Sequence, residues 1–159
     1  MKVTAQEEYG LRCLLQLARN ASSGAPVTVR EIASQEGLSA AYAEKLLRLL
    51  SRARLAESTR GLRGGYRISR SPEQVTLGEV VRALGGVPNP ADLCARYTGK
   101  EQCCVHMADC GLRPVWKTLS LHMERILDQV SLSVLLEPEQ VVADNMQNLH
   151  RSLFGRTSA

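Results

Sequence analysis

The chain of 159 residues has no apolar run long enough to cross a bilayer. Its N-terminus also lacks the charged segment followed by an apolar stretch that marks a secretory signal. These two absences predict a cytoplasmic protein that has no membrane partner. In that reducing compartment, clustered cysteines favour metal binding or redox chemistry over structural disulfides.

Two patterns of thiol enzymes are also missing. The sequence contains no C-x-x-C motif and no alternation of strands and helices that would build βαβ units. A thioredoxin-like oxidoreductase depends on both features. We therefore expect a protein that is not an enzyme.

What the sequence does contain is a group of cysteines. Four of the five, Cys94, Cys103, Cys104 and Cys110, fall within seventeen residues, "CARYTGKEQCCVHMADC". Thiols that only fill a core are usually scattered through periodic apolar segments, so this grouping predicts metal or redox chemistry. The fifth, Cys13, lies on the apolar face of a periodic segment and is predicted to be a core thiol.

Three thiolates and one further donor suit either tetrahedral zinc or the protein side of an iron-sulfur cluster. Structural zinc sites favour cysteine pairs two to four residues apart, whereas the spacing here is wide and irregular. Adjacent Cys103 and Cys104 are not expected to bind the same iron, so one of them is a spare or redox thiol. His106 and Asp109 are alternative donors in the same segment.

The formal net charge of +4 is distributed unevenly. Residues 1–70 carry 12 Lys and Arg against 6 Asp and Glu, and the remainder carries 8 against 10. Between Lys45 and Arg70, eight basic residues accompany a single acid, Glu57. Such a basic stretch neutralises phosphates and predicts a polyanionic partner, although charge alone also fits a solvated helix face.

Apolar spacing and capping motifs predict the domain in residues 1–86. A helix over about 6–20 is followed by a T-x-x-E capping box at Thr28, a C-cap at Gly37 and a second short helix beginning at Ser39. Two short helices separated by "EGLS" indicate a helix-turn-helix. The "RGLRGG" turn between short strands predicts a wing, and a second capping box at Thr76 opens a helix that ends at Gly85-Gly86.

Residues 87–111 show little periodicity and are predicted to form a cysteine-containing sensory loop. Residues 112–137 are predicted to form a dimerisation helix and a turn, with Pro114 tolerated in the first helical turn. The apolar seam of this helix follows coiled-coil spacing and comprises Leu112, Trp116, Leu119, Met123, Ile126 and Val130. Residues 138–159 form a tail with a short helix and no assigned function. The predicted fold is mainly α: a winged helix-turn-helix domain with a two-stranded wing and a long C-terminal dimerisation helix.

In a winged helix-turn-helix, the start of the second helix reaches the base edges of double-stranded DNA. The residues in that position are Ser39, Ala41, Tyr42, Glu44 and Lys45. Glu44 is suited to accept from a cytosine amino group, and Tyr42 is equally well explained by core packing. Lys45, Arg48 and Arg67 suit phosphate contacts. The wing contributes Arg60, Arg63, Gly64, Gly65 and Tyr66, with an arginine directed at the minor groove.

Several stretches resemble one known family. They are "MKVTAQEEYGLRCLLQLA", "VTVREIASQEGLSAAYAEKLLRLLSRARLAESTRGLRGGYRISRSPEQVTLGEVVRAL", the cysteine segment and the "LRPVW" that follows it. Over about residues 1–135 the sequence is similar to the Rrf2 family of dimeric bacterial transcription regulators, which includes iron-sulfur sensors of the IscR, NsrR and RsrR type. Its wing motif and its Cys-x5-Cys before the long helix carry the resemblance.

The resemblance implies a homodimer that binds a DNA operator and holds one iron-sulfur cluster per subunit, 2Fe-2S in preference to 4Fe-4S. It implies Cys94, Cys104 and Cys110 as ligands, since Cys104 rather than Cys103 preserves the family spacing. The histidine ligand of one branch is replaced here by Arg113. Other branches use an acid of the first helix from the partner subunit, which implies Glu8, with Glu7 as the alternative.

The family's base-reading positions fall on Ser39, Ala41 and Glu44, and its wing arginine falls on Arg60. The expected activity is a redox- or nitric-oxide-responsive regulator of transcription. The alternative is a regulator that lacks a cluster and uses thiol chemistry or zinc.

Overall fold

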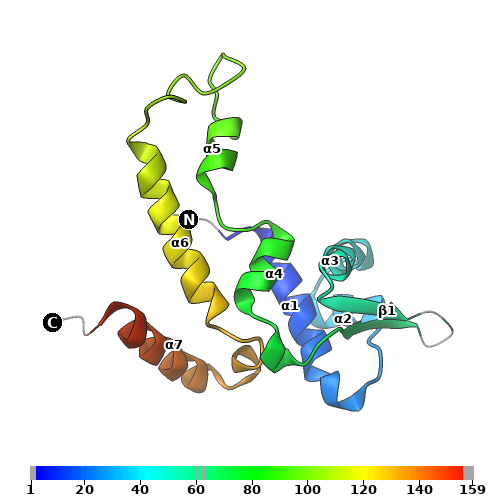
Figure 1. Ribbon diagram of the computed structural model, residues 1–159. Coiled ribbons are helices and arrows are strands. Elements are labelled where there is room, and N and C mark those ends of the chain that lie inside the picture. Colours follow the sequence, from blue (N-terminus) through cyan, green and yellow to red (C-terminus); the bar gives the residue numbers. More distant parts are fainter. Residues whose placement is uncertain (1–2, 60, 62–63, 156–159) are drawn as a thin grey trace.

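The computed structural model describes residues 3–59, 61 and 64–155. Within these ranges the fold is mainly helical with one two-stranded antiparallel sheet, which confirms the predicted winged-helix class (Figure 1). The elements in chain order are α1 (Ala5–Arg19), η1 (Ala21–Ser23), α2 (Val29–Glu36), α3 (Ala40–Arg52), β1 (Ala56–Thr59), β2 (Gly65–Ile68), η2 (Pro72–Gln74), α4 (Leu77–Leu84), α5 (Pro90–Arg96), α6 (Leu112–Asp128), η3 (Val134–Leu136) and α7 (Glu139–Phe154).

Helices α1 to α4 and the two strands form a winged-helix body around one apolar core. Leucines of α1 and α3 fill much of that core, and each fully buried leucine stabilises the fold by roughly 1.5–3 kcal/mol. The predicted capping boxes at Thr28 and Thr76 are both present, and Gly37 ends α2 with a φ of 66°. A third capping box, at Thr4 and Glu7, begins α1 and was not predicted.

The wing is held against the segment that precedes α2. Its strands pair with Ala56 opposite Ile68 and Thr59 opposite Gly65. Tyr66 and Val27 exchange backbone hydrogen bonds, both of 2.8 Å. A Cβ at Gly65 would lie 2.4 Å from the Val27 carbonyl oxygen, so this close approach requires glycine.

The prediction of a loop over residues 87–111 is wrong in its first part, where α5 forms. Asn89 begins this helix, because its side-chain oxygen accepts from the backbone N–H of Ala91 at 2.7 Å. Pro90 occupies the first helical turn, where a missing N–H has no cost. An asparagine cap followed by proline signals a helix start, but the segment has too little apolar periodicity to support it.

Helix α6 leaves its apolar face uncovered in the single chain. None of its residues is buried, and Leu112, Trp116 and Leu119 are 63, 44 and 48 % exposed. Pro114 lies in the first turn, as predicted. Val130 was predicted as the last seam residue, and this is wrong: the helix ends at Asp128 and Val130 is buried in the body.

After α6 the chain returns to the winged-helix body. Leu132 is fully buried in its core, and the Leu132 N–H donates to the Val75 carbonyl at 2.8 Å. The Leu77 N–H donates to the Val130 carbonyl at the same distance. Residues 87–129, here called the arm, therefore leave the body after α4 and rejoin it beside the start of α4 (Figure 1).

Helix α7 is longer than the short helix predicted in the tail. Its partly buried side chains recur at spacings of four and three, at Val142, Met146, Leu149 and Leu153. Phe154 packs edge-on against His122 of α6, with 6.0 Å between ring centroids. None of the helices in the described ranges combines the length and apolar character needed to cross a membrane.

Candidate functional site

A pocket of about 700 Å³ lies between α5 and α6 in the arm. Its wall is largely apolar and comprises Pro88, Pro90, Leu93, Leu112, Trp116, Leu119 and Met123. Three of the four grouped cysteines also line it: Cys94, Cys104 and Cys110. We call this cavity the thiol pocket.

The four grouped cysteines differ in exposure. Cys94 lies on α5, and Cys104 and Cys110 lie on the segment between α5 and α6; all three are partly buried. Cys103 is exposed. The pocket thus contains the same three thiols that the family spacing selects. Cys13 belongs to the core as predicted, where burial raises the pKa of its thiol to about 11.

Arg113 holds the segment that carries these thiols. Its guanidinium donates to the carbonyl oxygens of Met107 at 2.7 Å and His106 at 3.3 Å. The Met107 N–H in turn donates to the Cys104 carbonyl at 3.1 Å. The role of Arg113 could not be predicted beyond the loss of a histidine ligand, because contacts to backbone carbonyls leave no signal in residue spacing.

The thiols line one pocket without converging on one point. Among the described residues, no three His, Cys, Asp or Glu side chains are grouped closely enough to bind a metal ion. Thiolates are the ligands that iron-sulfur clusters and structural zinc prefer. The donor set is therefore of the kind that binds a cluster, but the three thiols would have to lie closer together than they do here to ligate one.

The two predicted acidic ligands have different surroundings. Glu7 completes the capping box, because its carboxylate accepts from the N–H and the hydroxyl of Thr4, both at 2.8 Å. Glu8 is exposed in the first turn of α1 and is not part of the pocket wall formed by the described residues. The single chain does not bring Glu8 to the thiols. Of the two alternative donors in the cysteine segment, His106 lines the pocket, whereas Asp109 is exposed and is not part of its described wall.

The predicted DNA-reading residues lie at the start of α3 and along one side of it. Ser39 caps the helix by accepting from the Tyr42 N–H, and Ala41 and Lys45 are exposed. Arg48 Nη2 donates to Glu44 Oε1 at 2.6 Å, an ion pair that raises the pKa of Arg48. Two of the predicted DNA contacts are therefore bonded to each other.

Tyr42 is partly buried and packs against the core. Its ring meets that of Tyr9 on α1 edge-on, with centroids 6.3 Å apart. The ammonium of Lys45 lies 6.0 Å from the centre of the Tyr42 ring. These contacts give Tyr42 a structural role in joining α3 to α1.

Arg60 and Arg63, the predicted wing arginines, lie outside the described residues. Gly64, Gly65 and Tyr66 are partly buried. Arg67 pairs across the wing with Glu57, with Nη2 and Oε2 3.0 Å apart. The predicted phosphate contact of Arg67 therefore competes with an ion pair inside the wing.

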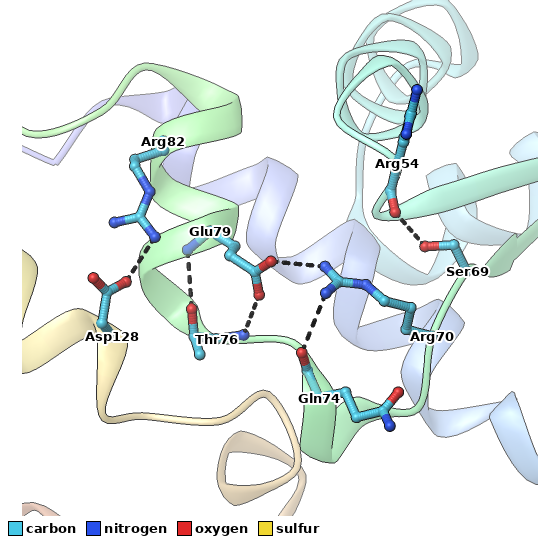
Figure 2. Close-up of polar contacts among 8 residues, drawn as sticks. All are labelled: Arg54, Ser69, Arg70, Gln74, Thr76, Glu79, Arg82 and Asp128. Atoms are coloured by element: carbon cyan, nitrogen blue, oxygen red, sulfur yellow. Dashed lines mark hydrogen bonds and ion pairs between the residues drawn. The ribbon is translucent and has the colours of Figure 1, made fainter.

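Helix α4 is tied to both neighbouring parts of the molecule (Figure 2). Toward α6, Arg82 Nη2 donates to Asp128 Oδ1 at 2.7 Å, and the carboxylate raises the pKa of Arg82. Toward the wing, Arg70 Nη2 donates to Glu79 Oε1 at 2.8 Å. Burial raises the pKa of Glu79, but hydrogen bonds from the Thr76 N–H and from Arg70 outweigh burial and lower it.

The first two helices are joined by a buried carboxylate. Glu36, at the end of α2, accepts from Arg12 Nε at 2.6 Å and from the side-chain amide of Gln16. Its side chain is only 6 % exposed. Burying a carboxylate is costly unless it is paired, so these bonds fix α1 against the helix-turn-helix.

Comparisons with known proteins agree with this arrangement. A family model, Rrf2, described as an iron-dependent transcriptional regulator, matches residues 3–138. Protein rrf2 of Nitratidesulfovibrio vulgaris is 34 % identical over 149 residues, which cover 94 % of this chain and 96 % of that protein.

Two solved structures are similar over most of their length. IscR of T. potens has a TM-score of 0.64 at 25 % identity, covering 98 % of this chain and 93 % of that one. CymR, described as the global cysteine regulator of B. subtilis, has a TM-score of 0.65 at 27 % identity, covering 86 % and 96 %.

Proposed function

Since the chain belongs to the Rrf2 family of transcription regulators, we propose that it acts as a cytoplasmic homodimer on a double-stranded DNA operator, under the control of an iron-sulfur cluster. The family consists of regulators and not enzymes. The observation that supports a cluster is the thiol pocket, because Cys94, Cys104 and Cys110 line one apolar cavity. The signal is a change in redox state or exposure to nitric oxide.

These three cysteines and Glu8 of the partner subunit would hold the cluster. When bound, a 2Fe-2S cluster supplies an iron centre that reacts with oxidants and nitric oxide; a 4Fe-4S cluster is the alternative. The pocket wall around the thiols is largely apolar. A carboxylate is a harder ligand than a thiolate, so Glu8 would be the most weakly bound ligand of such a site.

The uncovered face of α6 supports the homodimer. Leu112, Trp116 and Leu119 are exposed along one side of a helix with coiled-coil spacing. Exposed apolar patches of this kind mark interfaces. Ligation by Glu8 requires that pairing through α6 bring α1 of one subunit toward the arm of the other.

As a ligand, Glu8 would tie α1 of one subunit to the arm of the other, and without that ligation α1 would be free to change its position. Tyr9, next to Glu8, packs against Tyr42 of α3, and Arg12 is bonded to Glu36 of α2. The start of α1 is therefore in contact with both helices of the helix-turn-helix. A shift there alters the separation of the two α3 helices in the dimer, and with it the fit to operator half-sites.

Anaerobic purification tests the cluster. We expect a coloured protein that contains iron and sulfide, and a Cys94→Ser variant that has lost both. Cys103→Ser is the matched control, because Cys103 is exposed. We expect this variant protein to keep the full iron content. A colourless, iron-free anaerobic preparation would contradict the proposal, and zinc found by mass spectrometry would identify the zinc-containing alternative.

A second candidate is a regulator controlled by thiol oxidation without a cluster. Its support is the exposed Cys103 beside Cys104, together with the likeness to CymR, described as a global cysteine regulator. Here peroxide oxidises a thiolate to sulfenic acid, and a neighbouring thiol displaces water to form a disulfide. Peptide mapping of iron-free protein after peroxide treatment would detect that disulfide.

A further inference from the structure

The ion pair between Glu44 and Arg48 lies where α3 is proposed to meet the bases. Arg48 Nη2 and Glu44 Oε1 are 2.6 Å apart, and the two side chains are 64 and 45 % exposed. Ala41 and Lys45 are exposed on the same helix. Both members of the pair therefore remain accessible from the DNA side.

Glu44 needs a cation to approach DNA. Phosphates repel an isolated carboxylate, and its useful role in the major groove is to accept a hydrogen bond from a base amino group, as from cytosine N4. Arg48 occupies one oxygen, Oε1, and cancels the negative charge. The other oxygen, Oε2, accepts no hydrogen bond from the described residues, and its lone pairs can accept from a base.

Arg48 lies on α3 near the wing. Glu44 is the main cause of the raised pKa of Arg48, and Tyr66 on β2 adds to it. Tyr66 is in turn paired through its backbone with Val27. The guanidinium thus pairs with Glu44 on its own helix, 2.6 Å away, and lies near Tyr66 of the wing.

We infer that Arg48 is a positioning residue for base recognition, which holds Glu44 so that Oε2 accepts from a cytosine amino group in the major groove. This inference rests on the proposed DNA reading by α3. It replaces the expected role of Arg48 as a phosphate contact. A guanidinium that already neutralises Glu44 binds a phosphate less strongly than a free guanidinium does.

The test begins with a random-sequence duplex library. Full-length wild-type protein selects its preferred sites, and Glu44→Ala identifies the base pair whose preference depends on Glu44. Binding is then measured by fluorescence anisotropy on the selected duplex and on the same duplex with that C·G pair changed to T·A. We expect wild-type protein to prefer the C·G duplex by roughly tenfold.

Arg48→Ala is expected to reduce this preference to less than about twofold, as Glu44→Ala does, with no further loss in the double variant. Arg48→Lys keeps the charge but loses the fork geometry, and should recover only part of the preference. Arg52→Ala is the matched control: it removes an exposed arginine one turn further along α3 and should keep the tenfold preference.

The contrary outcomes separate the two ideas. If Arg48→Ala weakens binding to both duplexes equally and lowers the salt dependence of binding by about one phosphate contact, Arg48 is a phosphate contact. In that case the inference is wrong, while the proposed function stands. If Glu44→Ala changes no base preference, the inference also fails. If wild-type protein selects no sequence from the library, the proposed operator binding fails as well.

Discussion

Arg82 and Asp128 are 46 residues apart in the chain, yet their side chains form an ion pair of 2.7 Å between α4 and the end of α6. The helices approach closely there, since a Cβ at Gly78 would lie 1.9 Å from Asp128 Oδ1. Both side chains are more than two-fifths exposed, and such pairs contribute only about 0.2–1 kcal/mol. The pair therefore fixes geometry more than it adds stability.

Replacing Arg82 should weaken communication between the arm and the DNA-binding helices. We expect Arg82→Ala to lower the free energy of unfolding by less than about 1 kcal/mol, and to reduce the ratio of operator affinities between iron-loaded and iron-free protein. Arg151→Ala on α7 is the control for loss of one exposed arginine. Fluorescence anisotropy on a selected operator measures the ratio, and an unchanged ratio would show that the ion pair carries no signal.

Glu79 should make stability depend on acid pH. Its folded-state pKa lies below the usual 4.5, so its stabilising contribution is complete above that value and is lost as the pH falls through the lowered pKa. Glu79→Gln should therefore be less stable at neutral pH and show a flatter decline below about pH 4.5. Urea unfolding at a series of pH values measures this, and the exposed Glu73→Gln should follow wild type. Parallel curves for Glu79→Gln and wild type would contradict the assignment.

Leu132→Ala should destabilise the winged-helix body, although the residue follows α6 in sequence. Leu132 is fully buried in the core, and loss of such a side chain costs about 2–5 kcal/mol. Val141→Ala, at a side chain 41 % exposed, should change the free energy of unfolding by less than about 1 kcal/mol. Urea denaturation compares the two variants. Equal effects would mean that the segment after α6 is not part of the core.

The five cysteines should differ in reactivity toward iodoacetamide in iron-free protein. Thiolates are the reacting species, so exposed Cys103 should be labelled first. Cys13 is fully buried, and its pKa is about 11, so it should be protected at pH 8 until the protein unfolds. Mass spectrometry of digested samples follows each site. Labelling of Cys13 at the rate of Cys103 in folded protein would contradict its place in the core.

The body was predictable because its signals are local. A T-x-x-E box, a glycine C-cap and apolar residues spaced by three and four each define a helix from a few neighbouring residues, and Thr28, Gly37 and Thr76 all act as predicted. The wing followed from its glycine-rich turn in the same way. The place of Cys13 in the core followed from its helical spacing.

The arm was less predictable because its structure depends on distant contacts. Val130 continues the spacing of the α6 seam, but its backbone pairs with Leu77, more than fifty residues earlier. Arg113 acts through backbone carbonyl groups of residues 106 and 107, which any residue type would supply. The pairing of Glu44 with Arg48 follows helical spacing of four residues and was predictable in principle, but each residue was predicted as a separate DNA contact.

The return of the chain through Val130 and Leu132 has a mechanical consequence. A rod joined to a domain at one end can swivel about its joint without turning the domain. The arm is pinned at two points, after Leu84 and again at the start of α4, where Leu77 bonds to Val130. Tilting it applies a torque to α4, which packs against α1 and α3. A movement of the thiol-bearing arm is therefore expected to displace α4, and through it the helices α1 and α3 of the DNA-binding body.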